Sequence, residues 1–562
     1  MSITKSQTER IKSIFPGNKF IIPAYQRKYS WTHNERFALW KDIEESSNDN
    51  MDHFIGTLSF KQNQSKGLAS YTVYEVIDGQ QRITSLFILL KVLIDRLKDE
   101  ELKADQMLNY IGAMGNLRLR PLGQDESFLD QLLFAEMEIK PSTLKKRSQK
   151  YMHSAKQEFC ALSAKLTNEE VIDRIKFIQD KVEVLVFNVE SQAQAVKMFS
   201  IINDRGLPLR ILDKTKSILM LYSTLHLSES LNDFINDAFE AIFDSYDDLL
   251  VCRDDIGILG RLEENTIFTH HYYSARHLFQ RTWNNRDGAD TIFDNIKSEC
   301  ERLKDDQIKL TSFIRSYVED FKEFTLHYSK LINEVTTKAA YDKPFRFLEF
   351  TATLYPLIVR LYMSNQLDQL LHILEITEVR VYKLRGTNPI ADMYSLSSHV
   401  TSSNPPMEEV KQSLVAFNEK FVNNHVFGTY LDDALAGNGA VKYLLAEFSN
   451  ANLQYPAYKD LQVEHIFSRN PNFDVKVYLF GDDYDYEKNK IGNLTLLESG
   501  LNDGLSNQAP INKVTGYLQS SIGATRELGG AINGGEFNRL NVEERKQRII
   551  DFCIQRFSLN GH

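Results

Sequence analysis

The sequence predicts a multidomain α+β protein, and three observations support this fold class. The chain has 562 residues, whereas a single hydrophobic core stops growing at ~250–300 residues, so more than one domain is expected. Apolar residues make up 42% and charged residues 25%, which excludes collagen-like, low-complexity and largely disordered chains. The residue pattern also changes twice, which predicts separate parts at residues 1–225, 226–425 and 426–562.

Residues 1–225 mix β-like runs with helical patterns and predict an α/β domain. Residues 54–60 (FIGTLSF) and 71–77 (YTVYEVI) read as strands separated by a polar, glycine-containing segment, which is typical of a long hairpin. Residues 181–189 (KVEVLVFNV) alternate apolar and polar side chains and predict a third strand. The pattern becomes helical after Ser191, which we expect to cap that helix.

The middle and C-terminal parts differ from each other in composition. Residues 226–425 contain few Gly and Pro residues and repeat apolar residues at helical spacing, as in 367–384, so we expect an all-helical connector. From residue 426 onward the chain is richer in glycines, asparagines and polar turns, above all at 481–535. This composition indicates a small, loop-rich domain over residues 426–562.

Charge and cysteine content limit the partners and cofactors. The net charge of −10 means that nucleic-acid binding would need a local basic groove or a metal. The four cysteines are far apart in the sequence, so we expect no disulfide framework, and any metal would be held by oxygen and nitrogen. The apolar stretches fall short of the ~20 residues of a membrane span, and the first residues are polar. We therefore expect a cytoplasmic protein with no membrane partner.

A strand, a turn and the start of a helix at residues 74–97 form the first candidate site. In the segment DGQQR, residues 78–82, unpaired backbone N–H groups and a guanidinium converge where the helix begins. Arg82 could clasp a phosphate with two hydrogen bonds, Asp78 could hold a metal or a water, and the glutamines could donate amide protons. The alternative is an ordinary turn with a capping aspartate and solvated glutamines.

Two further segments carry polar residues that could join this site. Residues 22–31 contain a Gln-Arg pair ahead of two aromatic residues, although the aromatics could equally be core and the arginine a surface residue. Residues 200–218 contain Asn-Asp-Arg at the predicted end of one helix, before Gly206, and Asp213 at the start of the next helix. Taken singly, each segment is more often structural.

The fixed order of these segments is more specific than any of them alone. The series QRxYxW, IGTL, DGQQR and NDRG, followed by an Asp-x-x-Lys helix, resembles the N-terminal domain of the GmrSD family of modification-dependent restriction systems. The resemblance covers about residues 8–220 and implies a ParB/sulfiredoxin-like fold that binds and hydrolyses a nucleoside triphosphate: GTP, ATP, UTP or CTP. It also implies that the following residues line the nucleotide pocket: Gln26, Arg27, Asp78, Gln80, Gln81, Arg82, Asn203 and Arg205.

The second candidate site lies in residues 461–513. Glu464 and His465 end a short apolar strand, and the later Asn493 and Asn502 complete the order His, Asn, Asn of an HNH, or ββα-metal, nuclease. Phosphodiester hydrolysis needs a base to activate water and a hard cation to neutralise the leaving oxygen. We interpret His465 as the catalytic base and expect Glu464 and Asn502 to offer oxygen ligands to Mg²⁺ or Mn²⁺. Asn493 would orient His465 by bonding the backbone across the loop.

Alternatives stay open at this second site. Without its context, His465 would be read as a lone buried histidine beside an asparagine-rich turn. The sequence also leaves open which side chain reaches the metal, among Asn502, Asp503 and Asn507.

The sequence EHI, then IGNLTLL, then a downstream Asn and Lys513, resembles the HNH-like nuclease domain that is usually fused to the GmrSD N-terminal domain. This resemblance covers about residues 430–560. The chain departs from it in one place, because many relatives carry Pro two residues after EHI, where this chain has Phe467-Ser468-Arg469.

Three other clusters are expected to be structural. The pair His270-His271 with His277 has no nearby carboxylate pattern and predicts a packing or solvated surface rather than a metal site. The basic runs 145–150 and 545–548 predict solvated helix faces, although either could touch phosphate.

Together these features predict an NTP-dependent, type IV-like endonuclease of bacterial defence, which hydrolyses phosphodiester bonds in modified phage DNA. Double-stranded DNA and a nucleotide are the expected partners, and a homodimer is compatible with the sequence. Two rivals stay open: a nucleotide-sensing DNA-binding regulator with a structural HNH-like fold, and a nuclease for unmodified DNA or RNA. The sequence leaves open the nucleotide and the modification, since glucosylated hydroxymethylcytosine and phosphorothioate both fit the family.

Overall fold

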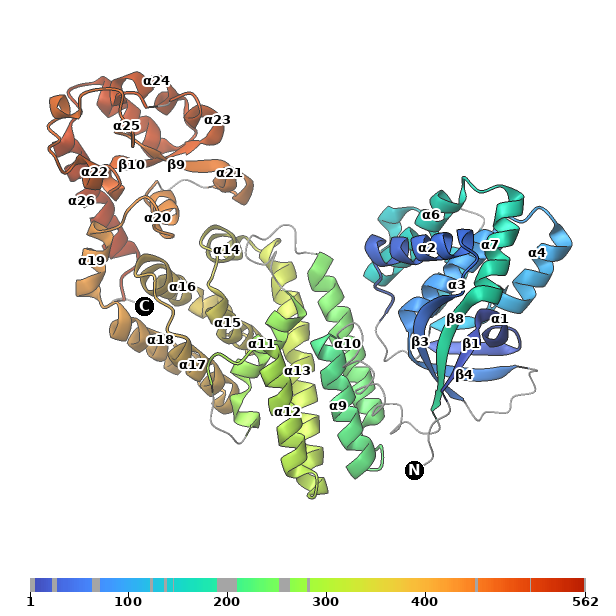
Figure 1. Ribbon diagram of the computed structural model, residues 1–562. Coiled ribbons are helices and arrows are strands. Elements are labelled where there is room, and N and C mark those ends of the chain that lie inside the picture. Colours follow the sequence, from blue (N-terminus) through green and yellow to red (C-terminus); the bar gives the residue numbers. More distant parts are fainter. Residues whose placement is uncertain are drawn as a thin grey trace. The chain divides into compact units, whose positions relative to one another are not determined.

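The computed structural model describes residues 6–22, 28–62, 71–121, 125–135, 139–144, 146–189, 210–251, 263–279, 284–449, 453–505 and 507–559. The chain divides into two compact units, Met1–Val251 with Asp287–Leu326, and Cys252–Arg286 with His327–His562. Both units combine helices with a β-sheet, which confirms the predicted α+β class (Figure 1).

The first unit contains a six-stranded mixed sheet with the order β1-β8-β3-β4-β2-β7. Its strands are β1 (Ser6–Arg10), β2 (Asn18–Ile22), β3 (His53–Gln62), β4 (Thr72–Asp78), β7 (Leu119–Pro121) and β8 (Val182–Val189). Strands β3 and β4 pair antiparallel, which confirms the predicted hairpin, and β8 pairs parallel with β3 as the predicted third strand. The short strands β1, β2 and β7 were not predicted, and a two-stranded ribbon, β5 (Gly112–Ala113) with β6 (Asn116–Leu117), accompanies them.

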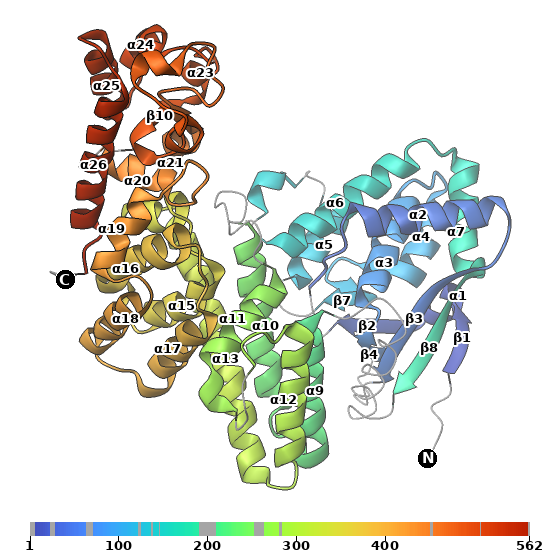
Figure 2. The same cartoon turned by 60° about the vertical axis from the view of Figure 1, so that its left-hand side comes forward.

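Helix α3 (Gln80–Asp95) is the central helix of this unit, because every residue from Ile83 to Ile94 is buried. Helices α2, α3, α6 and α7 lie together on one face of the sheet (Figure 2). The helices of the unit are α1 (Ile11–Ile14), α2 (His33–Asn48), α3, α4 (Glu100–Gln106), α5 (Glu126–Phe134), α6 (Arg147–Ser163), α7 (Asn168–Lys181), α9 (Ile211–His226), α10 (Asn232–Val251), α12 (Ala289–Leu303) and the start of α13 (Gln307–Val335).

The second unit is a series of helices followed by a β-hairpin and a second group of helices. Its first helices are α11 (Glu264–Ser274), α14 (Ala339–Tyr341), α15 (Tyr355–Met363), α16 (Leu367–Thr377), α17 (Ile390–Ser403), α18 (Met407–Phe421), α19 (Asn424–Asp432), α20 (Val441–Phe448) and α21 (Tyr455–Asp460). Strands β9 (Leu461–His465) and β10 (Leu494–Glu498) follow, with α22 (Tyr484–Glu487) between them, and then α23 (Ser499–Asn502), α24 (Pro510–Gln519), α25 (Gly523–Asn533) and α26 (Arg539–Arg556). Within 226–425 the described residues form helices and turns but no strand, as expected.

The histidine pair on α11 is part of the core. The ring of His270 lies nearly parallel to the rings of Tyr328 and Tyr355, with centroids 6.0 and 5.9 Å away, and burial lowers its pKa to about 3. This agrees with the expected packing role. Across the described residues no three His, Cys, Asp or Glu side chains group in a way that could hold a metal ion.

Two further sequence expectations can be compared with the structure. Cys160, Cys300 and Cys553 are free thiols, and Cys252 lies outside the described residues. None of the helices in the described part of the chain combines the length and apolar character that crossing a membrane requires.

Candidate functional site

The DGQQR segment forms a tight turn between β4 and α3. Asp78 is the last residue of β4, and Gly79 caps α3 with a left-handed φ of +90°. A Cβ atom at Gly79 would lie 2.3 Å from Cδ2 of Leu58 and 3.0 Å from the carbonyl oxygen of Thr57. Only glycine fits this turn, because of both its backbone conformation and the space available. The turn therefore packs closely against β3 at Gly79, where α3 begins, and Gln80, the first residue of α3, is half-buried.

Arg82 and Asp78 lie near each other at this turn. The guanidinium of Arg82 donates a hydrogen bond to the carbonyl of Thr57 and lies against Gly56, where a Cβ would be 2.7 Å from Nη1. Burial raises the pKa of the Asp78 carboxyl, and the Arg82 charge and the Gly79 N–H offset only part of this effect. The two predicted residues are thus neighbours at the end of the sheet.

Gln81 contacts the backbone that follows the predicted residues Gln26 and Arg27. Its Oε1 accepts a hydrogen bond from the N–H of Ser30 at 2.8 Å, and its Nε2 donates to the carbonyl of Lys28 at 3.1 Å. The hydroxyl of the intervening Tyr29 pairs with Ser85 Oγ of α3 at 2.7 Å. Gln81 therefore fastens this segment to α3 instead of presenting a free amide.

Four predicted nucleotide-site residues, Gln26, Arg27, Asn203 and Arg205, lie outside the described residues, as does Ser191. The helix expected around Asp213 is α9, which begins at Ile211. On α9, burial lowers the pKa of the Lys216 ammonium to about 7, and Asp213 and Glu240 offset part of this effect. The sequence pattern Asp-x-x-Lys named this lysine but gave no sign of its burial.

The second candidate site is built on the β9–β10 hairpin. The strands pair antiparallel, with His465 opposite Leu494 and Glu464 opposite Thr495, and helix α23 follows β10 directly. His465 is the last residue of β9 and is half-buried, and its Nε2 lies 3.2 Å from Oδ1 of Asn489. Sequence reasoning missed Asn489, although it opens the same NKIGN segment that contains Asn493.

The surroundings of His465 favour its neutral form. Burial lowers the pKa of the imidazole, and the positive charges of Arg469, Lys513 and Lys488 lower it further. The hydrogen bond with Asn489 raises the pKa but does not reverse the shift. A histidine below its usual pKa carries an available lone pair at neutral pH.

Asn493 is fully buried and bonds to the backbone on the other side of the loop. Its Oδ1 accepts from the N–H of Phe467 at 2.8 Å, and its Nδ2 donates to the carbonyls of Phe467 and Lys488 at 2.8 and 2.7 Å. Its own carbonyl accepts from the N–H of Ile466 at 2.8 Å. These are the bonds to backbone that the sequence predicts for Asn493, and they fix the two residues next to His465.

The side chains of Glu464 and Asn502, which the sequence predicts as metal ligands, form hydrogen bonds with other side chains. Oε1 of Glu464 accepts from Nζ of the buried Lys513 at 2.6 Å and from the hydroxyl of Tyr517 at 3.4 Å. Nδ2 of Asn502 donates to Oε1 of Gln462 at 2.7 Å. Neighbouring strand residues point to opposite faces, so Glu464 and His465 diverge.

The two oxygen donors are therefore suited to a hard cation by type, but they are not arranged around one point. Of the other two residues that the sequence left open, Asp503 is exposed, and the backbone carbonyl of Asn507 accepts from the N–H of Asn472 at 3.1 Å. The ammonium of Lys513 also donates a hydrogen bond to the carbonyl of His465 at 2.7 Å, so Lys513 stabilises the end of strand β9.

The basic run 545–548 is not the solvated helix face that the sequence predicts. Arg545 is buried, and its Nη1 donates to the carbonyls of Ile491, Gly492 and Leu494 at 3.4, 3.0 and 2.7 Å. Lys546 is also buried and pairs with Asp432 at 2.6 Å, whereas Arg548 is exposed. The prediction was wrong for the first two because the charge pattern does not reveal which polar groups of a neighbouring loop need donors.

Comparison with known families gives a match for each end of the chain. The N-terminal domain of GmrSD restriction endonucleases matches residues 11–220, which include the DGQQR turn. The C-terminal domain of GmrSD restriction endonucleases matches residues 418–552, which include the β9–β10 hairpin. No curated protein matches the chain. With both domains present in order, the chain belongs to the GmrSD family of restriction endonucleases.

Proposed function

We propose that the chain is an NTP-dependent endonuclease that cleaves modified foreign DNA, such as phage DNA, in bacterial defence. The chain belongs to a family of restriction endonucleases, which act on DNA, so family membership supports both a DNA substrate and a nuclease role. The observation that carries the proposal is His465: a histidine with a lowered pKa, at the end of β9, next to a loop braced by Asn493.

His465 would act as the general base on the attacking water. An amide oxygen can only accept a hydrogen bond, so in the contact with Asn489 Oδ1 the proton is on Nε2 of His465. Nδ1 then keeps its lone pair and is the atom that can take a proton from water. The hairpin β9–β10 followed by α23 supports the HNH-like, ββα interpretation of this domain.

Positive side chains would attract the phosphate in a chain whose net charge is −10. Arg469 is exposed four positions after His465, and Lys488 donates to the carbonyl of Arg469 at 2.9 Å. These charges already act on His465, since they lower its pKa. A local positive field of this kind offsets the overall repulsion of DNA.

We also propose dependence on Mg²⁺ or Mn²⁺, because Glu464 and Asn502 are hard oxygen donors. When bound, such an ion would neutralise charge on the leaving oxygen. The contacts of Glu464 with Lys513 and of Asn502 with Gln462 would have to be exchanged before either oxygen could serve a shared cation. Asn502, Asp503 and Asn507 stay candidates for the further ligand.

For the N-terminal domain we propose a ParB-like fold that binds and hydrolyses GTP, ATP, UTP or CTP. The support is the turn at Gly79, which places Arg82 and the N-terminus of the 16-residue helix α3 at the end of the sheet. Helix N-termini and guanidinium groups both favour phosphate. We assign Gln81 to holding the segment after Gln26 and Arg27, and propose that these two, Asp78, Gln80, Asn203 and Arg205 complete the pocket.

Nucleotide state would then control DNA cleavage, so that cutting is restricted to foreign DNA. The test is a cleavage assay of modified and unmodified phage DNA with the purified chain, with each nucleotide and each divalent cation added or omitted. We expect cleavage of modified DNA with nucleotide, loss of cleavage in EDTA, and recovery with Mg²⁺ or Mn²⁺. Equal cleavage without nucleotide, or recovery with thiophilic metals alone, would contradict the corresponding part of the proposal.

A further inference from the structure

Helix α26 contacts the loop that supports His465. The carbonyls of Ile491, Gly492 and Leu494 all accept from the Nη1 of Arg545, and the carbonyl of Asn493 accepts from Ile466 N–H. A Cβ at Gly492 would lie 2.4 Å from the carbonyl oxygen of Val542, so the helix backbone and the loop touch directly. Arg545 of α26 thus bonds the residues on either side of Asn493, and Asn493 in turn bonds Ile466 and Phe467.

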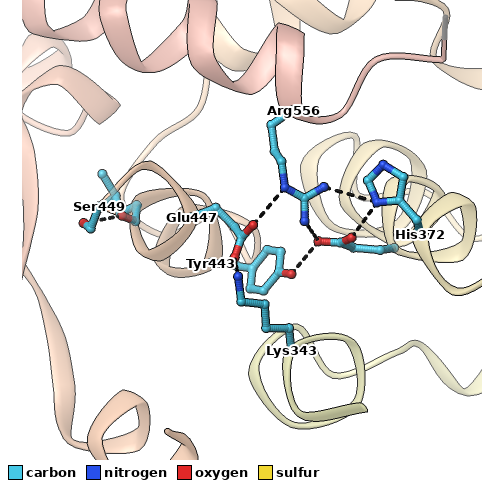
Figure 3. A network of polar contacts seen from close by, with 8 residues as sticks. Lys343, His372, Tyr443, Glu447, Ser449 and Arg556 are labelled. Atoms are coloured by element: carbon cyan, nitrogen blue, oxygen red, sulfur yellow. Dashed lines mark hydrogen bonds and ion pairs between the residues drawn. The ribbon is translucent and has the colours of Figure 1, made fainter. Parts of the chain in front are cut away.

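The other end of α26 is fixed by a network of charged groups (Figure 3). Arg556 donates from Nη2 to Glu375 Oε1 at 2.6 Å and from Nε to Glu447 Oε2 at 2.9 Å, and its Nη1 lies 3.2 Å from His372 Nδ1. Tyr443 donates to the same Glu375 oxygen at 2.6 Å. The last turn of α26 is therefore tied to helices α16 and α20.

A fully buried arginine, Arg380, also stabilises this end of the helix. Arg380 has no exposed surface and donates from Nε and Nη2 to the carbonyl of Phe557 at 2.9 and 2.6 Å, directly after α26 ends. Its Nη2 also donates to Asn424 Oδ1 at 2.8 Å. Arg545 and Arg556 both lie on α26, one uninterrupted 18-residue helix, so the contacts at Arg556 constrain the position of Arg545.

We propose that Arg545 is a positioning residue of the nuclease site, and that α26 holds it in place from the Arg556 network. Arg545 fixes the carbonyls on either side of Asn493, and Asn493 fixes the backbone of Ile466 and Phe467 that follows His465. The inference rests on the proposed function of His465. It adds Arg545, a residue of the C-terminal helix that the charge pattern alone predicts to be on the surface.

The test compares Arg545→Met and Arg545→Lys with the matched control Arg548→Met, which removes an exposed arginine from the same helix. For folded protein we expect Arg545→Met to lower kcat of DNA cleavage by about 10–100-fold with little change in KM, because misplacing a catalytic group by about 1 Å can cost this much. Arg545→Lys should recover part of kcat, and Arg548→Met should keep it. A purely structural arginine would instead lower the amount of folded protein while kcat per folded molecule stayed at the wild-type value, and that result would overturn the proposal.

Amide hydrogen exchange gives a reading that does not depend on activity. Exchange at Ile466, Phe467 and Leu494 should be faster in Arg545→Met than in wild type and unchanged in Arg548→Met. Unchanged exchange at these amides would overturn the inference even if cleavage fell. If Arg545→Met does not fold, amide exchange at the same residues is compared between Arg545→Lys and wild type. An Arg545→Lys variant with both the exchange rates and the kcat of wild type would overturn the inference. Failure of the proposed function is separate, because it would appear as cleavage that survives His465→Ala.

Discussion

The two candidate sites are built in different ways. The DGQQR site is local: Asp78, Gly79 and Arg82 are neighbours in sequence, and one glycine with a left-handed backbone brings them against β3. The His465 site is assembled from distant segments, since 49 positions separate Lys513 from Glu464 and 51 separate Arg545 from Leu494. The first site should therefore be sensitive to changes in its turn, and the second to changes in buried partners far along the chain.

The largest expected effect is the loss of the buried ion pair behind His465. Lys513→Met leaves the Glu464 carboxylate buried without its cation, so we expect a loss of about 3–5 kcal/mol in the free energy of unfolding. Urea denaturation of wild type and variant measures this difference in the free energy of unfolding. The double variant Glu464→Gln with Lys513→Met should recover most of the loss, and a loss that persists in the double variant would show that packing, not charge, dominates here.

Arg82→Ala tests the local site through nucleotide binding. A charge-assisted contact to phosphate contributes about 1.5–3 kcal/mol, so affinity should fall about ten- to a hundredfold. Arg82→Lys should recover only part, because an ammonium cannot reproduce the planar fork. Calorimetric titration of each NTP measures these affinities, with His465→Ala as a control that should bind nucleotide like wild type. Equal affinities in all variants would mean that DGQQR is only a structural turn.

Gly79→Ala tests the turn itself. The added Cβ meets Leu58 at 2.3 Å in a left-handed backbone, and we expect a loss of about 1–3 kcal/mol in unfolding free energy. Gly115→Ala is the matched control, because Gly115 also has a positive φ of 74° but nothing lies within 4 Å of its Cβ position. The control separates backbone strain from the clash, so equal losses in the two variants would contradict the close packing against β3.

The smallest effect is a shift in the pH dependence of cleavage. His465 must be neutral to act as a base, so the rate should fall as pH drops through its folded pKa, which lies below the usual 6.5. Arg469→Met removes a positive charge that lowers this pKa, so the acid limb of the pH–rate profile should move to higher pH. A limb that stays in place would show that Arg469 does not act on His465.

The sequence predicted the parts of the fold that carry strong periodicity. Strands β3, β4 and β8 were expected from short apolar or alternating runs, and the helix expected after the DGQQR turn is α3, which is buried from Ile83 to Ile94. The short strands β1, β2 and β7 were missed because runs of three to five residues give too little pattern to separate a strand from a loop.

The candidate sites show the same limit. Asp78, Arg82, His465 and Asn493 could be predicted as candidates because their neighbours in sequence form recognisable motifs. The partners Asn489 and Arg545, and the pairing of Glu464 with Lys513, depend on which distant segments pack together. The charge pattern predicted an exposed Arg545, and this was wrong because a buried arginine and a surface arginine look alike in sequence.

The central claim is that His465 is the base of a DNA nuclease. The most direct measurement is the single-turnover rate of cleavage of modified phage DNA by wild type and His465→Ala, with nucleotide and Mg²⁺ present, and with the exposed His425→Ala as a matched control. We expect His465→Ala to lose about 10²–10⁴-fold in rate while its folding, its NTP hydrolysis and the rate of the control stay unchanged. Cleavage by His465→Ala within about tenfold of wild type would contradict the assignment, because a lost general base costs more than this.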